Sequence, residues 1–304
     1  MMKRRYFRIV IAGIIFLLAL LLTLYPVISN LYNQRHQSLI HTAYEEVIQQ
    51  ADTQDLERIR ELAIAYNEAI TPGTAADTYS KAALQKASAD YDSQLDPSGN
   101  GIMGYIEIPK ISVNLPIYHG TESDTLERGT GHLLGSSLPV GGNSTHTIIT
   151  GHSGLATQKM FTDLEQLQAG DVFYIHVLGE VLAYQVFHWE PVLPHDTTKL
   201  VIRQDEDLCT LITCYPTGIN THRLLVQAER IPYEAAEEIV EEIVIQKEKN
   251  QSNWEDQYML GVWLGIWGML FALAIYLTVL LVRRNCRKKK GGRYVRKKQT
   301  KKLE

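Results

Sequence analysis

Cys214 is the residue of this sequence with the clearest potential for chemistry. It closes the apolar, β-branched run 210–214, which Pro216 and Gly218 stop, so the sequence predicts a strand that carries the thiol to its end. A thiol in that place is a candidate nucleophile. A free cysteine is also among the residue types most often buried, so Cys214 on its own could equally be a small core residue.

Two other side chains favour the nucleophile. Arg223 opens a second alternating run after a short turn, so pairing of the two strands would place its guanidinium near Cys214. A guanidinium favours a thiolate and can hold a developing oxyanion. His152 lies between glycines at the end of the β-branched run 145–150, where an imidazole could act as acid and base. The alternative for His152 is a histidine on a surface loop.

These residues resemble the sortase family. Thr210-Leu211-Ile212-Thr213-Cys214 matches the signature TLxTC, His152 falls in the family's upstream Thr-Gly-His-like segment, and Arg223 occupies the position of its downstream arginine. The resemblance runs from about residue 101 to residue 232. Four further segments match in the family's order, at 104–111, 115–120, 131–133 and 137–139.

The residues and the resemblance together predict a reaction. Cys214 would attack a peptide carbonyl, and His152 would protonate the leaving amine and later deprotonate the incoming one. Arg223 would hold the oxyanion or the substrate backbone, with Thr213 as a further candidate donor to the substrate. The resemblance implies cleavage of an LPxTG-like sorting signal after Thr, a thioacyl enzyme and transfer to an amine. This chemistry requires no cofactor, and no metal is expected among the catalytic residues; the resemblance leaves open a calcium site on the scattered acids, as some relatives have.

Charge is distributed very unevenly along the 304 residues, although the net charge is only −4. Four basic residues precede position 9 and twelve follow position 282, whereas the segment between holds fourteen basic and thirty-three acidic residues. Both basic ends flank uncharged apolar stretches, at 9–25 and 258–282, which predict membrane helices. The first could instead be a cleavable signal peptide, but 24–29 lacks an Ala-x-Ala site, which favours an uncleaved anchor.

The positive-inside rule places both basic ends in the cytoplasm and the acidic body outside. The basic tail directly follows a membrane span, so it is interpreted as an orientation signal that touches anionic lipid, and no nucleic-acid partner is expected. With the resemblance, this indicates the cell membrane of a Gram-positive bacterium. The expected organisation is a basic end and anchor at 1–29, an extracellular helical, lid-like region at 30–100, the catalytic barrel at 101–232, an acidic linker at 233–257, a second span at 258–282 and a cytoplasmic tail at 283–304.

The predicted fold is mainly all-β, a closed eight-stranded sortase-like barrel with short helices. Residues 30–70 have the spacing of an amphipathic helix or helix pair, broken near Asp52. From Ile102 the apolar period becomes two, which indicates short strands in a closed barrel rather than a parallel α/β sheet. The strand candidates are 105–109, 115–119, 145–150, 172–177, 181–189, 208–214 and 223–230, with one helix near 157–167.

Two spans around the domain look like the class C, pilus-assembly sortases, whose amine acceptor is a lysine of another pilin. Expected partners are therefore a pilin or surface protein with the sorting signal, a second pilin and the lipid membrane. That subgroup usually has an inhibitory lid with Asp-Pro-aromatic, whereas Ser98 follows Asp96-Pro97 here. We expect a less occluded site, or Tyr79 or Tyr91 in place of the missing aromatic.

Other functions remain open at this point. The enzyme could anchor proteins to cell-wall peptidoglycan, or it could be an extracellular cysteine peptidase that transfers the acyl group to water. A metal-binding module is disfavoured because the spacing of His132, His146, His152, Cys209 and Cys214 matches no compact metal motif. Cys209 is expected in the core, since five residues along one strand put it on the face opposite Cys214.

Overall fold

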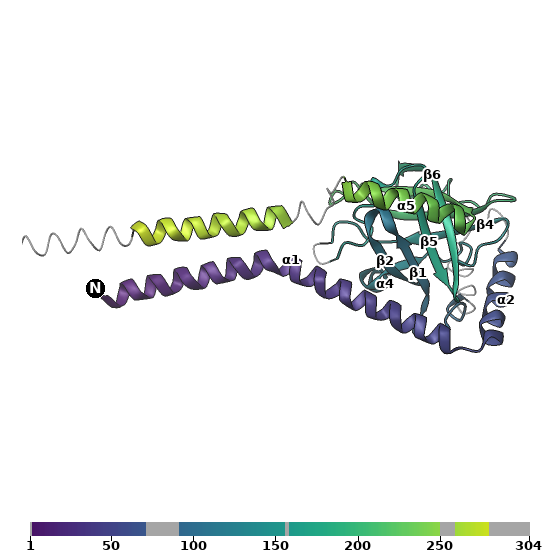
Figure 1. The fold of residues 1–304 in the computed structure, drawn as a ribbon, viewed down its shortest axis with the longest axis horizontal. Coiled ribbons are helices and arrows are strands. Elements are labelled where there is room, and N and C mark those ends of the chain that lie inside the picture. The colour runs from purple at the N-terminus through teal and green to yellow at the C-terminus, as the bar shows by residue number, and fades with distance from the viewer. Residues whose placement is uncertain (1, 71–90, 156–157, 250–258, 280–304) are drawn as a thin grey trace, which may run out of the picture. The chain divides into compact units, whose positions relative to one another are not determined.

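The computed structural model describes residues 2–70, 91–155, 158–249 and 259–279. The chain divides into two units, residues 27–251 and the two ends, 1–26 with 252–304. The larger unit holds all the strands of the described residues and the helices that cover them (Figure 1). Two helical stretches, Val10–Asn33 and Met259–Val279, are long and apolar enough to cross a membrane.

Eight strands close into a barrel in the order β1-β2-β3-β4-β7-β8-β6-β5, which confirms the predicted fold class. Two of the neighbouring pairs, β2 with β3 and β4 with β7, are parallel. Closure leaves no exposed sheet edge. The strands are β1 Ile102–Ile108, β2 Val113–His119, β3 Thr130–His132, β4 Thr145–Thr150, β5 Val172–Val177, β6 Glu180–Val192, β7 Asp207–Tyr215 and β8 His222–Ile231.

Two expectations about the barrel were incomplete or wrong. The three-residue strand β3 was not among the candidates, because a run this short carries no readable period. The helix expected near 157–167 is absent from its described part, which consists of turns and the 3-10 helix η3 (Leu164–Gln166). Phe161, Leu164 and Leu167 are buried at a helix-like spacing of three, but Met160 has a positive φ of 44°, which a continuous α-helix does not allow.

The predicted helix pair before the barrel is present. α1 (Met2–Gln50) ends two residues before the expected break at Asp52, and Asp52 caps α2 (Thr53–Ala69) by accepting a bond from the Gln54 amide at 2.9 Å. α1 is continuous across the expected boundary at residue 29. The remaining helices are α4 (Ser123–Arg128), α5 (Tyr233–Lys249) and the 3-10 helix η2 (Pro109–Ile111).

Buried polar contacts attach both N-terminal helices to the barrel. The Tyr44 hydroxyl of α1 donates to the Met103 carbonyl at 3.1 Å and accepts from the Leu178 amide at 3.0 Å. The Asn67 side chain of α2 donates to the Leu138 carbonyl at 3.1 Å and accepts from its amide at 2.7 Å. Asn67 thereby gives the Leu138 amide its partner and adds a bond to a carbonyl that also accepts from the Val140 amide at 2.8 Å.

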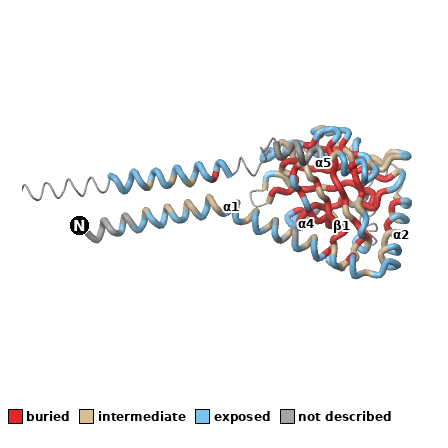
Figure 2. The backbone as a smooth tube through the Cα atoms, in the orientation of Figure 1, coloured by how far each residue is buried: buried red, intermediate tan, exposed pale blue. Residues whose placement is uncertain are grey.

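Apolar burial is concentrated in the strands, while the outer faces of the helices are exposed (Figure 2). The main core fills the barrel and includes Ile106, Ile117, Phe173 and Leu211. A smaller cluster lies separately and consists of Ile148, Val192, Leu200, Ile212 and Leu225. Since Leu211 and Ile212 are neighbours on β7 but belong to different clusters, the strand packs apolar side chains on both faces.

Candidate active site

Strand register places Cys214 directly opposite Arg223. β7 and β8 pair antiparallel through the turn that Pro216 begins, from Leu208 opposite Glu229 to Tyr215 opposite His222. Residues that pair in this way project from the same face of the sheet, with Cβ atoms about 4.5–5.5 Å apart. The two side chains therefore leave the sheet next to one another, as the alternating pattern predicted, and both line the same groove.

His152 reaches the same place from the other side of β7. β4 pairs with β7 in parallel, with Thr150 opposite Ile212, and the Gly151 amide continues the pairing by donating to the Ile212 carbonyl at 3.0 Å. His152 thus leaves the sheet beside Cys214. A Cβ at position 151 would lie 2.7 Å from the Phe161 ring, so the chain can only pass here as glycine.

Two hydroxyl groups fix the segment that carries His152. The Thr213 hydroxyl donates to the Gly151 carbonyl at 2.8 Å, and the Ser153 hydroxyl donates to the Cys214 carbonyl at 2.7 Å. The Thr213 residue is 3% exposed, so its hydroxyl is committed to the chain rather than free for a substrate. Ser153 was not among the predicted site residues, although its place directly after His152 could have suggested it.

All four residues singled out by the sequence line one groove of about 360 Å³. Its floor is apolar and comes from the sheet and the β6–β7 loop, residues 193–206. Among its described lining residues, Arg223 is the only permanent cation and Asp196 the only carboxylate. The other lining residues are Thr121, Leu126, Leu133, Thr150, Gly151, Val192, Leu193, Pro194, Thr197, Leu200, Ile212 and Leu225.

The loop wall was missed by sequence reasoning. Residues 193–206 carry no periodic pattern, and only the fold reveals that they lie over the sheet beside Cys214. The groove as a whole can accommodate an extended peptide with apolar side chains on its floor and a carbonyl between the thiol and the guanidinium.

Cys209 and Cys214 occupy different environments, as expected. Both are free thiols, but Cys209 is fully buried in the barrel core, where desolvation raises its pKa well above the ordinary value. Cys214 is partly exposed in the groove. Because the thiolate is the reactive form, this difference makes Cys214 the accessible nucleophile of the pair.

The remaining histidines singled out by the sequence have structural partners. The His132 Nδ1 lies 2.9 Å from the Tyr91 hydroxyl and its Nε2 lies 2.8 Å from the Ser137 carbonyl; burial lowers its pKa to about 4. His119 lies with its Nε2 2.6 Å from the Gln94 carbonyl. Among the described residues, no three His, Cys, Asp or Glu side chains are grouped to hold a metal ion.

The expectation that Tyr91 takes the place of a lid aromatic is wrong. Tyr91 is 2% exposed, accepts from the Gly120 amide at 3.0 Å and does not line the groove. The Asp96 carboxylate accepts from the amides of Asn100 and Gly101, both at 3.0 Å, and so closes a turn ahead of β1. Tyr79 lies outside the described residues. Within the described part of region 30–100, no residue lines the groove.

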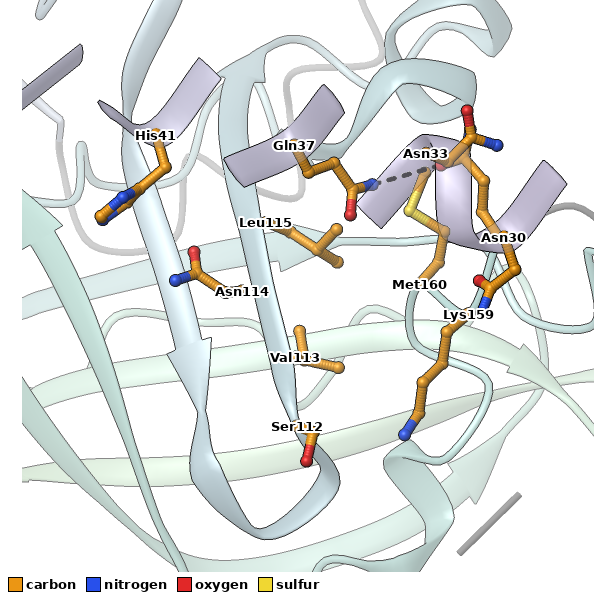
Figure 3. A pocket seen from close by; sticks show the side chains of 11 residues that line it. Asn30, Asn33, Gln37, His41, Ser112, Val113, Asn114, Leu115, Lys159 and Met160 are labelled. Atoms are coloured by element: carbon orange, nitrogen blue, oxygen red, sulfur yellow. Dashed lines mark hydrogen bonds between the residues drawn. The ribbon is translucent and has the colours of Figure 1, made fainter. Parts of the chain in front are cut away.

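A second hollow, of about 190 Å³, lies between α1 and the β1–β2 hairpin (Figure 3). Gln37 on α1 donates to Gln158 at 3.3 Å. Lys159 donates to the Ile111 carbonyl at 2.6 Å and pairs with Asp163 at 3.0 Å, with both charged side chains 7% exposed. These contacts fasten the chain that follows His152, and no groove residue is shared with this hollow.

Comparison with known proteins gives a consistent result. The sortase domain model matches residues 106–231. Sortase D of Bacillus subtilis is 28% identical over 138 residues, which are 44% of this chain and 67% of that protein.

Solved structures match over a longer part of the chain. Sortase C1 from Streptococcus agalactiae is 40% identical, with a TM-score of 0.59, over 64% of this chain and 98% of that one. Sortase C from Streptococcus pneumoniae, a structure described as giving insight into catalysis and pilin substrate specificity, is 41% identical with a TM-score of 0.55, over 64% and 97%.

Proposed function

This chain belongs to the sortase family, whose members are cysteine transpeptidases, and we propose that it joins pilin subunits through an LPxTG-like sorting signal. The observation that carries the proposal is the strand register, which puts Cys214 opposite Arg223 and beside the segment of His152 in a single groove. The similarity to sortase C structures, one of them described in terms of pilin substrate specificity, supports a pilin as the substrate.

In the proposed first half-reaction, the Cys214 thiolate attacks the carbonyl of the sorting signal's Thr, with His152 as imidazolium. Arg223, projecting from the same face of the sheet, stabilises the negative charge that develops on the carbonyl oxygen. The carbon–nitrogen bond after Thr breaks, a carbon–sulfur thioester forms, and His152 gives its proton to the leaving amine.

In the second half-reaction, a lysine amine of another pilin attacks the thioester. His152 accepts the proton of that amine, the carbon–sulfur bond breaks, and the Cys214 thiolate is restored. Thr213 and Ser153 act on the chain rather than on the substrate, because their hydroxyls hold the two segments that carry His152 and Cys214. We propose this positioning role for Thr213 in place of a direct bond to the substrate.

We further propose that Val10–Asn33 and Met259–Val279 span the cell membrane, with both basic ends in the cytoplasm and the barrel outside. The enzyme would then meet secreted proteins as they emerge beside it. The boundaries proposed for the catalytic barrel are 101–232, with the helical region 30–100 before it and the acidic linker 233–257 after it.

Product analysis tests this function. The full-length protein in lipid nanodiscs is incubated with an LPxTG-like peptide and either a pilin-derived lysine peptide or a cell-wall stem peptide, beside Cys214→Ala, and masses are recorded. We expect a Cys214-dependent thioacyl adduct and an isopeptide product. Joining only to a cell-wall stem peptide would indicate anchoring to peptidoglycan, and release of free acid with every amine would indicate a peptidase. Absence of any adduct on Cys214 would refute the catalytic assignment.

A further inference from the structure

The β6–β7 loop needs side-chain partners because it is long and irregular. Between the end of β6 at Val192 and the start of β7 at Asp207, its backbone has no strand pairing to satisfy it. The loop nevertheless forms one wall of the groove. The residues that it contributes to the lining are Leu193, Pro194, Asp196, Thr197 and Leu200.

His146 provides the first attachment. It lies on β4 and is 1% exposed; its Nδ1 is 2.9 Å from the Val201 carbonyl and its Nε2 is 2.7 Å from the Thr210 hydroxyl on β7. A carbonyl can only accept, so Nδ1 carries the hydrogen and Nε2 accepts from Thr210. Burial lowers the pKa of His146, which keeps the ring in this neutral form.

Gln227 provides the second attachment from β8. It is 2% exposed and its Nε2 donates to the Lys199 carbonyl at 3.1 Å. The two bonded carbonyls, at 199 and 201, lie on either side of Leu200. Leu200 is 6% exposed and packs into the small apolar cluster that forms the groove floor with Val192, Ile212 and Leu225.

We propose that His146, Thr210 and Gln227 are positioning residues that hold the β6–β7 loop in the shape that binds the peptide. Three polar side chains buried on a face otherwise packed with apolar ones destabilise the fold unless they form hydrogen bonds. Here His146 and Gln227 bond the loop carbonyls on either side of Leu200, and Thr210 bonds the second ring nitrogen of His146. A wall held in place before binding lowers the ordering cost of binding. The inference rests on the proposed function, in which this groove holds the sorting peptide.

Two substitutions of His146 distinguish the loss of its hydrogen bond to the loop from a general loss of packing. His146→Asn keeps a donor near the position of Nδ1 and can still bond the Val201 carbonyl. His146→Gln extends toward the position of Nε2 and loses that donor. Each variant is prepared full-length in nanodiscs, and the rate of thioacyl formation on Cys214 is measured against peptide concentration. Hydrogen exchange of the loop amides is measured in parallel without peptide.

We expect His146→Asn to behave like the wild type in both measurements. His146→Gln should raise the half-saturating peptide concentration about tenfold, the effect of one buried hydrogen bond, with the maximal rate within about twofold. Exchange of the amides in 193–203 should accelerate in this variant alone. Gln227→Met removes the other donor at nearly constant volume and should also raise the half-saturating peptide concentration. The test therefore does not depend on one position.

The proposal is overturned if His146→Gln and Gln227→Met both bind peptide like the wild type, or if they lower the maximal rate at unchanged half-saturation. Faster exchange throughout the barrel, rather than in the loop, would also overturn it. A failure of the proposed function is distinguishable, because the wild type itself would then form no adduct while the exchange results on the loop could still be read.

Discussion

Removing the Arg223 guanidinium tests the arrangement of the site most directly. Arg223 is partly buried opposite Cys214, and its Nη1 donates to the carbonyls of His222 at 3.1 Å and Asn220 at 3.4 Å. These bonds hold the planar guanidinium at the β7–β8 turn, where Arg223 lines the groove. A preorganised donor to an oxyanion contributes about 2.7–4 kcal/mol to catalysis. We therefore expect Arg223→Ala to lower the rate of thioacyl formation about 100- to 1,000-fold.

Arg223→Lys should recover only part of that loss. Lysine keeps the charge but has a single ammonium group, which cannot bond the local carbonyls and the oxyanion in the geometry of the guanidinium. The assay is single-turnover thioacyl formation on Cys214, followed by intact mass. Because peptide binding is also at issue, the rate is measured at several peptide concentrations to separate maximal rate from half-saturation.

Arg230→Ala is the matched control. Arg230 lies on the same strand, seven residues further, where its guanidinium lies 5.7 Å from the centre of the Tyr184 ring and lines a different hollow. Its loss should leave the rate within about threefold. The reasoning fails if Arg223→Ala also stays within threefold of the wild type, or if the two variants lose activity equally.

Three further results are expected from burial and bonding. Under native conditions iodoacetamide should label Cys214 but not Cys209, whose burial raises its pKa, and peptide mapping checks this result. Cys209→Ala should keep activity in the thioacyl-adduct assay. Burial lowers the pKa of His132 to about 4, so the unfolded chain binds a proton on this side chain at a higher pH than the folded chain does. The free energy of unfolding, measured in urea, should therefore be highest above about pH 6.5 and fall by about 3 kcal/mol as the pH falls toward 4. The fall should be smaller in His132→Leu, which has no imidazole to protonate. Asn67→Ala should destabilise the protein by about 1–3 kcal/mol in the same assay at pH 7, because the buried Leu138 amide loses the side-chain oxygen to which it donates.

The local parts of the site could be predicted from the sequence, and the long-range parts could not. Cys214 and Arg223 are joined by a short turn, so alternation along two neighbouring runs was enough to place them together. His152 is brought in by parallel pairing of β4 with β7, and no pattern within either strand specifies that pairing. The sequence marked His152 only through its glycines, of which Gly151 is required by the Phe161 ring.

The sequence did not predict the loop wall, and it wrongly predicted a helix near 157–167, for the same reason. The shape of residues 158–167 and 193–206 is decided by tertiary contacts, such as those of Lys159 with Ile111 and of His146 with Val201. Local propensity has little influence where buried side chains satisfy the backbone from distant strands. The region before the barrel was easier to predict, because the Asp52 cap is a local signal.

The alternation of β7 gives each residue of Thr210-Leu211-Ile212-Thr213-Cys214 a separate task. On the groove face, Thr210 donates to His146 under the loop, Ile212 forms the floor and Cys214 meets Arg223. In the alternate positions, Leu211 packs in the barrel core, and Thr213, which borders the groove, donates its hydroxyl hydrogen to the Gly151 carbonyl that precedes His152. A shift of one residue in the pairing register of β7 would exchange the two faces of the strand, bury the thiol and break both hydroxyl contacts. The pentapeptide therefore couples the nucleophile, the substrate groove and the histidine segment to one strand register.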